Sequence, residues 1–293
     1  MIVPGSTSQA LAAELAAVMG EPLAEVQVET FPDGELLAGA PGVSPERATI
    51  VTSTTSATAH LELLQLQDAM REAGADEIVT VLAYMGYARQ DAPMAPGKSE
   101  AESPTGYPLS ARAVAKAIGS STDRVLVVNP HEESVLEHFP VPAAAVSAAS
   151  ELATALPEAL TDPLFLSPDA GARDLAKSVR DAYGSGEIDH FEKSRTGGDS
   201  VEIVPNNAAV ADRDVIVTDD IIATGGTMSE AIAVLQDRDV GRVYTACVHP
   251  LLTGPARTRL ANAGVEAIIG TDTIERQSSV VSAAPVIASE LSE

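Results

Sequence analysis

The sequence predicts an α/β protein built from two similar domains, each a mostly parallel sheet flanked by helices. Short runs of β-branched residues alternate with Ala-rich segments whose apolar residues recur at helical spacing, a pattern typical of parallel strands joined by crossover helices. This alternation occurs in both halves of the chain. The 293 residues, 45% of them hydrophobic, are sufficient to bury a substantial core.

The first half contains three predicted strands and two predicted helices. We expect strands at residues 48–52, 77–82 and 124–128, and helices at residues 60–73 and 109–118. A domain boundary is predicted near residues 142–150, where the sequence also favours an Ala-rich helix. The predicted domains are therefore 1–145 and 146–293.

The second half repeats the alternation. We expect strands at 164–167, 188–192, 214–218, 242–248 and 266–270, and helices at 170–183, 227–238 and 255–263. A final helix at 279–291 is expected to pack back on the first domain. Two polar segments, 91–107 and 194–199, predict long loops, which in compact α/β folds are usually functional lids or disordered inserts.

The charge balance is strongly acidic, with 42 Asp and Glu residues against 18 Lys and Arg residues and a net charge of −24. Such a surface repels nucleic acid, so we expect no nucleic-acid partner. Only four of the basic residues are lysines. Because the Debye length falls to about 3 Å at molar salt, this composition favours a halophilic protein; an acidic mesophilic protein is the alternative.

Hydropathy and cysteine usage limit the class further. No run of eighteen apolar residues occurs, and no basic segment precedes an apolar one at the N-terminus, so we expect a soluble, cytoplasmic protein that does not bind membranes. Cys247 is the only cysteine, which excludes a disulfide framework within the chain and a multi-thiolate metal site. Its apolar neighbours predict a place in the core.

One segment has the composition of a sugar-phosphate site. An apolar strand at 215–218 is followed by two carboxylates, Asp219 and Asp220, and Thr224-Gly225-Gly226-Thr227 then opens a helix. The N-terminus of a helix binds anions through its unpaired N–H groups, and glycines let the backbone approach a phosphate closely. Carboxylates beside a phosphate site indicate a ligand that also carries hydroxyl groups.

This segment resembles the PRPP-binding motif of the type I phosphoribosyltransferase fold, which both phosphoribosyltransferases and PRPP synthetases share. The resemblance implies that Asp219 and Asp220 face the hydroxyls of ribose 5-phosphate. It also implies that five residues wrap the 5-phosphate: Ala223, Thr224, Gly225, Gly226 and Thr227. The motif alone does not choose between the two activities.

Two further segments indicate the synthetase. Phe31-Pro32-Asp33-Gly34-Glu35 lies early in the chain, and Tyr87-Ala88-Arg89-Gln90-Asp91 follows a predicted strand at its carboxyl end, where open α/β sheets bind ligands. Both resemble the nucleotide-binding segments of the ribose-phosphate pyrophosphokinase family. The resemblance implies that six residues contact ATP: Phe31, Asp33, Gly34, Glu35, Arg89 and Gln90. It also implies a homo-oligomer, because the first segment reaches the site of a neighbouring subunit in that family.

The remaining candidates are a metal pair and two cations. His131 follows the strand at 124–128 and can ligate a divalent metal, whereas His60, His138, His190 and His249 are predicted to be structural. Asp169 is either a metal ligand or the cap of the next helix. By the resemblance, His131 and Asp169 belong to Mg²⁺ sites. Lys193 and Arg195 follow the strand at 188–192, and the resemblance places them on a catalytic loop, with Arg195 also expected at ribose 5-phosphate.

The resemblance as a whole predicts a ribose-phosphate diphosphokinase, which transfers the pyrophosphoryl group of ATP to ribose 5-phosphate and releases AMP. Two alternatives remain: a phosphoribosyltransferase that consumes PRPP, and a non-catalytic regulatory homologue of the synthetase. The segment after Asp91 departs from the family, because acidic Glu100 and Glu102 replace the usual basic residues. Nucleotide affinity and any regulatory binding there are therefore not predicted.

Overall fold

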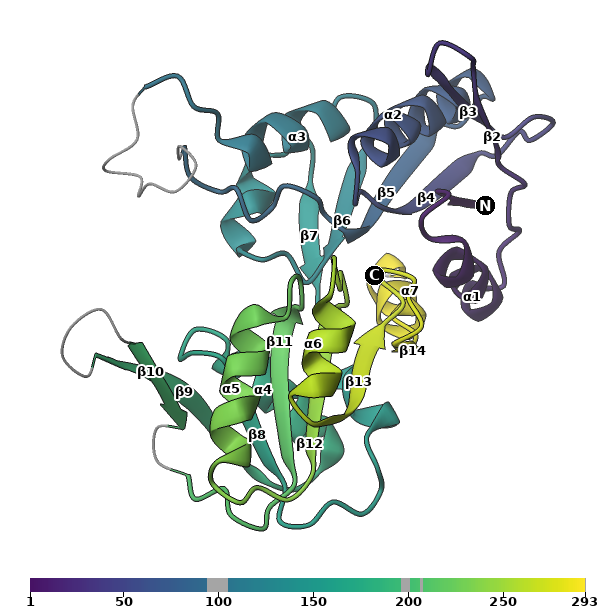
Figure 1. Ribbon diagram of the computed structural model, residues 1–293. Helices are drawn as coiled ribbons and strands as arrows, with labels where there is room; N and C mark the ends of the chain where they lie inside the picture. Colours follow the sequence, from purple (N-terminus) through teal and green to yellow (C-terminus); the bar gives the residue numbers. More distant parts are fainter. Residues whose placement is uncertain (94–104, 196–200, 206–207, 293) are drawn as a thin grey trace. The chain divides into compact units, whose positions relative to one another are not determined.

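The structure is a computed structural model that describes residues 1–93, 105–195, 201–205 and 208–292, with only the backbone described at 193–195 and 201–204 (Figure 1). The chain divides into two compact units. The first unit comprises Met1–Ser147, Thr273–Glu275 and Ala283–Glu293, and the second comprises Ala148–Asp272 and Arg276–Ser282. The polar segment predicted at 91–107 lies largely outside the described residues.

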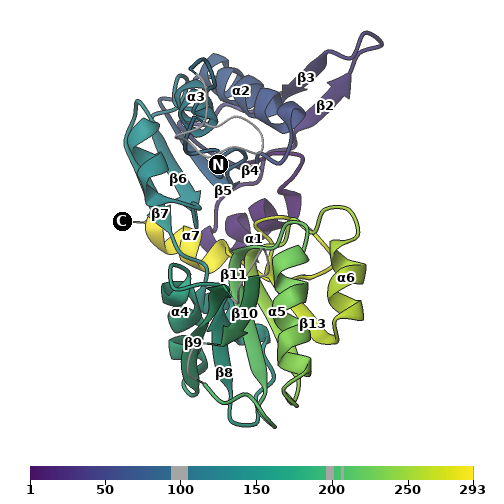
Figure 2. The same ribbon diagram turned by 60° about the vertical axis from the view of Figure 1, so that its left-hand side comes forward.

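The first unit contains a parallel five-stranded sheet in the order β1-β4-β5-β6-β7. Its strands are β1 (Ile2–Pro4), β4 (Arg47–Ser53), β5 (Glu77–Tyr84), β6 (Arg124–Val128) and β7 (Ala143–Val146). Its helices are α1 (Gln9–Met19), α2 (Ala57–Glu72), α3 (Ser110–Ile118), the 3₁₀ helix η2 (Glu133–His138) and α7 (Ala284–Leu291). Helices α2 and α3 cover one face of the sheet and α1 and α7 the other (Figure 1, Figure 2).

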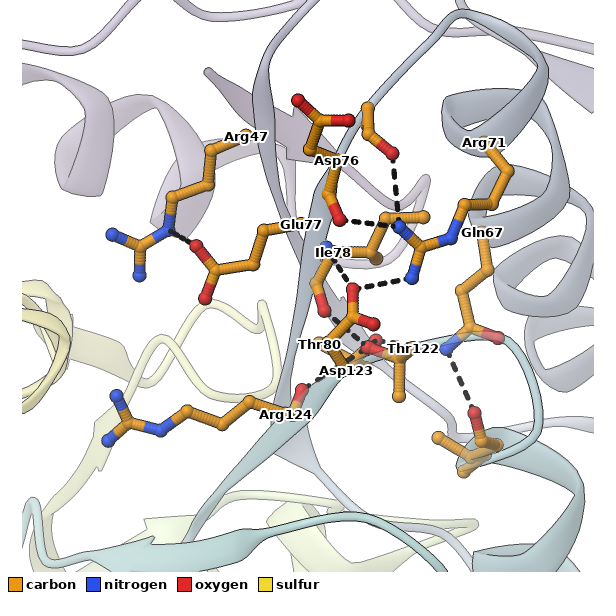
Figure 3. A network of polar contacts seen from close by, with 12 residues as sticks. Arg47, Gln67, Arg71, Asp76, Glu77, Ile78, Thr80, Thr122, Asp123 and Arg124 are labelled. Atoms are coloured by element: carbon orange, nitrogen blue, oxygen red, sulfur yellow. Dashed lines mark hydrogen bonds and ion pairs between the residues drawn. The ribbon is translucent and has the colours of Figure 1, made fainter.

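The amino ends of β5 and β6 are fixed by a polar cluster (Figure 3). The carboxylate of Asp123 accepts from the backbone N–H of Ile78 at 2.7 Å and from the guanidinium of Arg71. The hydroxyl of Thr122 donates to the carbonyl of Ile78 at 2.8 Å, and the amide of Gln67 donates to the hydroxyl of Thr80 at 2.9 Å. These contacts hold α2, β5 and the loop before β6 at the amino edge, opposite the edge where the strands carry their candidate functional residues.

A two-stranded antiparallel hairpin, β2 (Gln27–Thr30) and β3 (Leu36–Gly39), belongs to the first unit but not to its main sheet. The sequence did not indicate these strands. Strand β3 is covered on one side only, since Leu36 and Ala38 are buried while Leu37 is 53% exposed, and all four residues of β2 are exposed. The Phe31-to-Glu35 segment forms its turn.

The second unit contains a seven-stranded sheet in the order β10-β9-β8-β11-β12-β13-β14, parallel except for the β9–β10 pair. Its strands are β8 (Leu164–Ser167), β9 (Glu187–Arg195), β10 (Val201–Pro205), β11 (Val215–Ile221), β12 (Val243–His249), β13 (Val265–Thr271) and β14 (Ser279–Val281). Its helices are the 3₁₀ helix η3 (Ser150–Ala155), α4 (Arg173–Tyr183), α5 (Gly226–Gln236) and α6 (Ala256–Asn262). Cys247 is fully buried in β12, as predicted.

The predicted α/β class with parallel sheets is confirmed, and three local predictions need correction, one in its type and two in their bounds. The Ala-rich helix expected at 142–150 is replaced by β7, because pairing with β6 overrides the high helix propensity of alanine. The final helix expected at 279–291 begins only at Ala284, since Ser279–Val281 pairs with β13 as β14. The strand expected at 188–192 continues to Arg195, because it pairs with β10. The described residues contain no helix long and apolar enough to cross a membrane.

Candidate functional site

In the first unit, the candidate nucleotide residues lie where β5 ends. Ala88 is only 4% exposed and packs into the core, which anchors the segment and leaves Tyr87, Arg89 and Gln90 at the surface. The backbone of Tyr87 is left-handed, with φ 67°. The N–H of Gln90 donates to the carbonyl of Tyr87 at 2.9 Å, which closes the turn. The buried alanine between exposed residues therefore directs Arg89 and Gln90 toward solvent at the end of β5.

His131 lies beyond the carboxyl end of β6, the strand next to β5. The chain leaves β6 through Asn129, whose left-handed φ of 39° redirects the backbone. The side chain of His131 is exposed. Because β5 and β6 are parallel neighbours, Arg89, Gln90 and His131 lie at the same edge of this sheet.

The Phe31-to-Glu35 segment is a closed turn. The N–H of Phe31 donates to the carbonyl of Glu35, and the N–H of Gly34 donates to the carbonyl of Phe31, both at 2.8 Å. Gly34 has φ 91°, a conformation that favours glycine. The carboxylate of Asp33 accepts from the N–H of Glu35 at 3.1 Å, and the ring of Phe31 is 38% exposed. The turn therefore displays an aromatic face and two carboxylates at the end of the hairpin.

In the second unit, two adjacent carboxylates, Asp219 and Asp220, lie in the last three residues of β11. Each accepts a backbone hydrogen bond from the next residue: Asp219 from the N–H of Asp220 at 2.9 Å, and Asp220 from the N–H of Ile221 at 2.8 Å. Both residues are half-buried. Burial raises the pKa of Asp219 to about 8, and the neighbouring Asp220 and the charge of Asp169 act in the same direction. The pair therefore carries less than two negative charges near neutral pH unless cations or hydroxyl donors contact it.

The predicted phosphate loop forms the entry to α5. Gly225 is the N-cap with left-handed φ 69°, and no side chain caps this helix. The hydroxyl-bearing residues Thr224 and Thr227 are exposed. The backbone N–H groups of residues 224–228 make no hydrogen bond to any described residue. Five consecutive open donors at and before a helix N-terminus have the chemistry to bind an anion.

The carbonyls of this loop are held by a second loop, which the sequence did not indicate. The carbonyl of Ile222 accepts from the N–H of Leu252, and that of Ala223 from the N–H of Thr253, both at 2.9 Å. The guanidinium of Arg259, on α6, donates to the carbonyl of Thr224 at 2.7 Å. The only available signals were an arginine in an acidic chain and the Gly254-Pro255 pair after β12.

The other predicted residues of this unit are Asp169, in the turn before α4, and Lys193 and Arg195, in β9. Asp169 follows β8, and its Oδ1 accepts from the N–H groups of Gly171 at 2.9 Å and Ala172 at 3.1 Å. It therefore holds the turn before α4, much as the capping alternative suggested, although α4 begins only at Arg173. The backbone of Lys193 and Arg195 lies within β9, paired with β10, and not on a loop after the strand. Their side chains, and residues 196–200, lie outside the described part of the chain.

The acidic residues of the second unit could hold a divalent cation only together with oxygen ligands from a substrate or water. Among the described residues, no group of three His, Cys, Asp or Glu side chains could hold a metal ion unaided. The charges of Asp169 and Asp220 nevertheless both raise the pKa of Asp219, so each of them repels the charge of Asp219. Mg²⁺ is commonly held by one or two carboxylates together with substrate phosphates and water. A divalent ion that enters with a phosphorylated substrate would offset this repulsion.

Comparison with known proteins identifies the family. Residues 1–121 match the family model described as the N-terminal domain of ribose phosphate pyrophosphokinase, and residues 139–280 match the phosphoribosyl transferase domain. A ribose-phosphate pyrophosphokinase of Halobacterium salinarum is 60% identical over 292 residues, which are 99% of this chain and 100% of the relative. A ribose-phosphate pyrophosphokinase of Methanosarcina mazei is 44% identical over 293 residues, covering 99% of this chain and 95% of the relative.

A solved structure supports the same assignment. The crystal structure of phosphoribosylpyrophosphate synthetase from Mycobacterium smegmatis aligns with a TM-score of 0.82 and 25% identity, covering 100% of this chain and 97% of that one. Two units with a phosphate loop at the N-terminus of a helix define a protein of the phosphoribosyltransferase-like class. The chain belongs to the ribose-phosphate pyrophosphokinase family. The resemblance predicted from the sequence motifs is confirmed.

Proposed function

We propose that this enzyme transfers the pyrophosphoryl group of ATP to the anomeric hydroxyl of ribose 5-phosphate, forming PRPP and AMP. The observation that carries the proposal is the row of open N–H groups at residues 224–228, next to the Asp219 and Asp220 carboxylates. A phosphate fits the amides, and a diol fits the carboxylates, so one sugar phosphate satisfies both. Membership in the family supports the same substrate.

In this proposal, the loop binds the 5-phosphate and the carboxylates accept hydrogen bonds from the ribose hydroxyls. The oxygen on the anomeric carbon then attacks the β-phosphorus of ATP, the bond from that phosphorus to the α-phosphate oxygen breaks, and AMP leaves. Lys193 and Arg195 are assigned to stabilise the charge of the transferring group, and Arg195 also to contact ribose 5-phosphate. Asp220 is a candidate acceptor for the anomeric proton.

The nucleotide residues proposed in the first unit are Phe31, Asp33, Gly34, Glu35, Arg89 and Gln90. Arginine suits phosphate and stacking on a purine, and Gln90 can pair with a base edge. Their exposure and their position at strand and hairpin ends are consistent with these roles. The exposed turn at Phe31 supports the further proposal that it serves a neighbouring subunit of a homo-oligomer.

Mg²⁺ is the proposed metal, with His131 and Asp169 as candidate ligands. When bound with the nucleotide, it would neutralise charge on the phosphates. We further propose a cytoplasmic enzyme that works at high salt. The acidic composition, and the 60% identity to a Halobacterium relative, support this working environment.

The test is product analysis in molar KCl with Mg²⁺ present or chelated. ATP with ribose 5-phosphate should yield AMP and PRPP in equal amounts, and chelation should abolish both. A phosphoribosyltransferase would instead release pyrophosphate from PRPP and a nucleobase. A non-catalytic homologue would yield neither product set, yet co-assemble with an active synthetase.

A further inference from the structure

The phosphate loop is held by the segment that follows β12, which comprises the loop at residues 250–255 and helix α6. Three consecutive carbonyls, those of Ile222, Ala223 and Thr224, accept hydrogen bonds from this segment. In a trans peptide, the C=O and the N–H of the next residue point in opposite directions. The structure has no cis peptide among its described residues. Drawing these carbonyls toward α6 therefore turns the N–H groups of residues 223–225 the other way.

Arg259 supplies the last of these contacts and the only charged one among them. Its Nη1 lies 2.7 Å from the carbonyl of Thr224, and the same nitrogen lies 3.8 Å from the position that a Cβ on Gly226 would occupy. The cation is thus next to the open N–H groups at the start of α5. A guanidinium fixed at an anion site contributes favourable charge, in addition to orienting the peptide.

We propose that Arg259 is a positioning residue for ribose 5-phosphate, which fixes the Thr224–Gly225 peptide so that its N–H faces the 5-phosphate. This inference rests on the proposed function, because it assumes that the ligand of the loop is a sugar phosphate. Arg259 acts through the loop and does not itself contact the reacting atoms. Its effect therefore appears in substrate binding.

Three variants test the inference. Arg259→Ala removes both the hydrogen bond and the charge, and Arg259→Gln keeps a planar N–H donor without the charge. Arg257→Ala removes another exposed arginine two residues away on the same helix, whose side chain makes no hydrogen bond to the phosphate loop. Binding of ribose 5-phosphate is measured by calorimetry in molar KCl with Mg²⁺ and a non-hydrolysable ATP analogue.

We expect Arg259→Ala to weaken ribose 5-phosphate binding by about 10- to 100-fold, the effect of losing a charge-assisted hydrogen bond. The KM for ribose 5-phosphate should rise by a similar factor while kcat and the KM for ATP change little. Arg259→Gln should recover part of the loss, and Arg257→Ala should bind as the wild type does. If Arg259→Ala does not fold, the Gln variant carries the test, with weakened binding at an unchanged Tm as the expected result.

The inference is overturned if the Arg259 variants bind ribose 5-phosphate within about twofold of the wild type. It is also overturned if Arg257→Ala loses as much affinity, because a general charge effect would then explain the loss. Calorimetry reports binding whichever product the enzyme forms. Failure of the proposed function appears separately, as the absence of AMP formation by the wild type.

Discussion

Replacing Asp219 by asparagine should stabilise the ligand-free protein at alkaline pH. The side chain keeps its shape, and its Oδ1 can still accept from the N–H of Asp220. What is lost is a carboxylate whose pKa is raised to about 8 by burial first and by Asp220 second. In the wild type, the folded state keeps a proton on Asp219 that the unfolded state releases near pH 4. The free energy of unfolding of the wild type therefore falls as pH rises from about 4 to about 8.

The size of this effect follows from the shift. An ordinary value of 3.8 and a folded value of about 8 differ by about four pKa units, which at about 1.4 kcal/mol per unit set a ceiling of about 6 kcal/mol. The two carboxylates are only half-buried, so water and salt reduce their repulsion. We therefore expect the Asp219→Asn variant to gain about 1–3 kcal/mol over the wild type between pH 5 and pH 9.

The assay is chemical denaturation of both proteins at pH 5, 7 and 9 in molar KCl, without nucleotide or divalent cations. Asp237→Asn is the matched control, since Asp237 is an exposed carboxylate at the other end of α5. The difference between Asp219→Asn and the wild type should widen as pH rises, and that of the control should not. Parallel stability curves for Asp219→Asn and wild type would refute the assignment of a raised pKa to this pair.

Four further outcomes are expected. Lys193→Ala should lower kcat by about 10²–10³-fold while calorimetry still detects ribose 5-phosphate binding; unchanged turnover would remove Lys193 from the mechanism. Gly225→Ala should cost about 1–2 kcal/mol of stability, because an alanine is strained at φ 69°, and it should weaken ribose 5-phosphate binding. An unchanged Tm and an unchanged affinity would argue against a left-handed N-cap at this position. Burial opposes the charge of Asp123, but the Ile78 N–H and Arg71 outweigh it and hold the pKa of this partly exposed carboxylate below its usual range. Asp123→Asn should therefore lower the free energy of unfolding by about 1 kcal/mol at pH 7. The loss should be smaller in denaturation at pH 3, because the stability that the charged carboxylate contributes disappears as pH falls. Transfer from molar to dilute salt should lower the Tm, and a higher Tm in dilute salt would contradict the halophilic assignment.

Local patterns identified the residues at strand ends, because a parallel sheet brings the carboxyl ends of its strands to one edge. Arg89 and His131, which follow adjacent strands, were predicted in this way, as were Asp169 and Asp219. The roles of these residues in catalysis and binding remain predictions. The β-branched content of β5 and β11 was sufficient to place both strands from the sequence.

Features that depend on distant partners could not be predicted. The Ala143–Val146 strand has helical composition and becomes a strand only by pairing with β6. The orientation of the peptide after Thr224 depends on Arg259, 35 residues further along the chain. The spacing of apolar and polar residues along the chain does not indicate which backbone carbonyl an arginine far along the sequence will contact. The raised pKa of Asp219 likewise results from burial and from the neighbouring carboxylates, which only the folded unit defines.

The composition of the phosphate loop suits an acidic protein at high salt. At molar salt, charges more than about 3 Å apart are largely screened, so a cluster of distant surface lysines would attract a phosphate weakly. Hydrogen bonds from backbone N–H groups act at contact distance and add no net charge to the surface. The loop has five such donors, and a nearby cation, Arg259, is fixed with its Nη1 2.7 Å from the backbone carbonyl of Thr224. A chain with four lysines among 293 residues can therefore bind a phosphate without a basic patch.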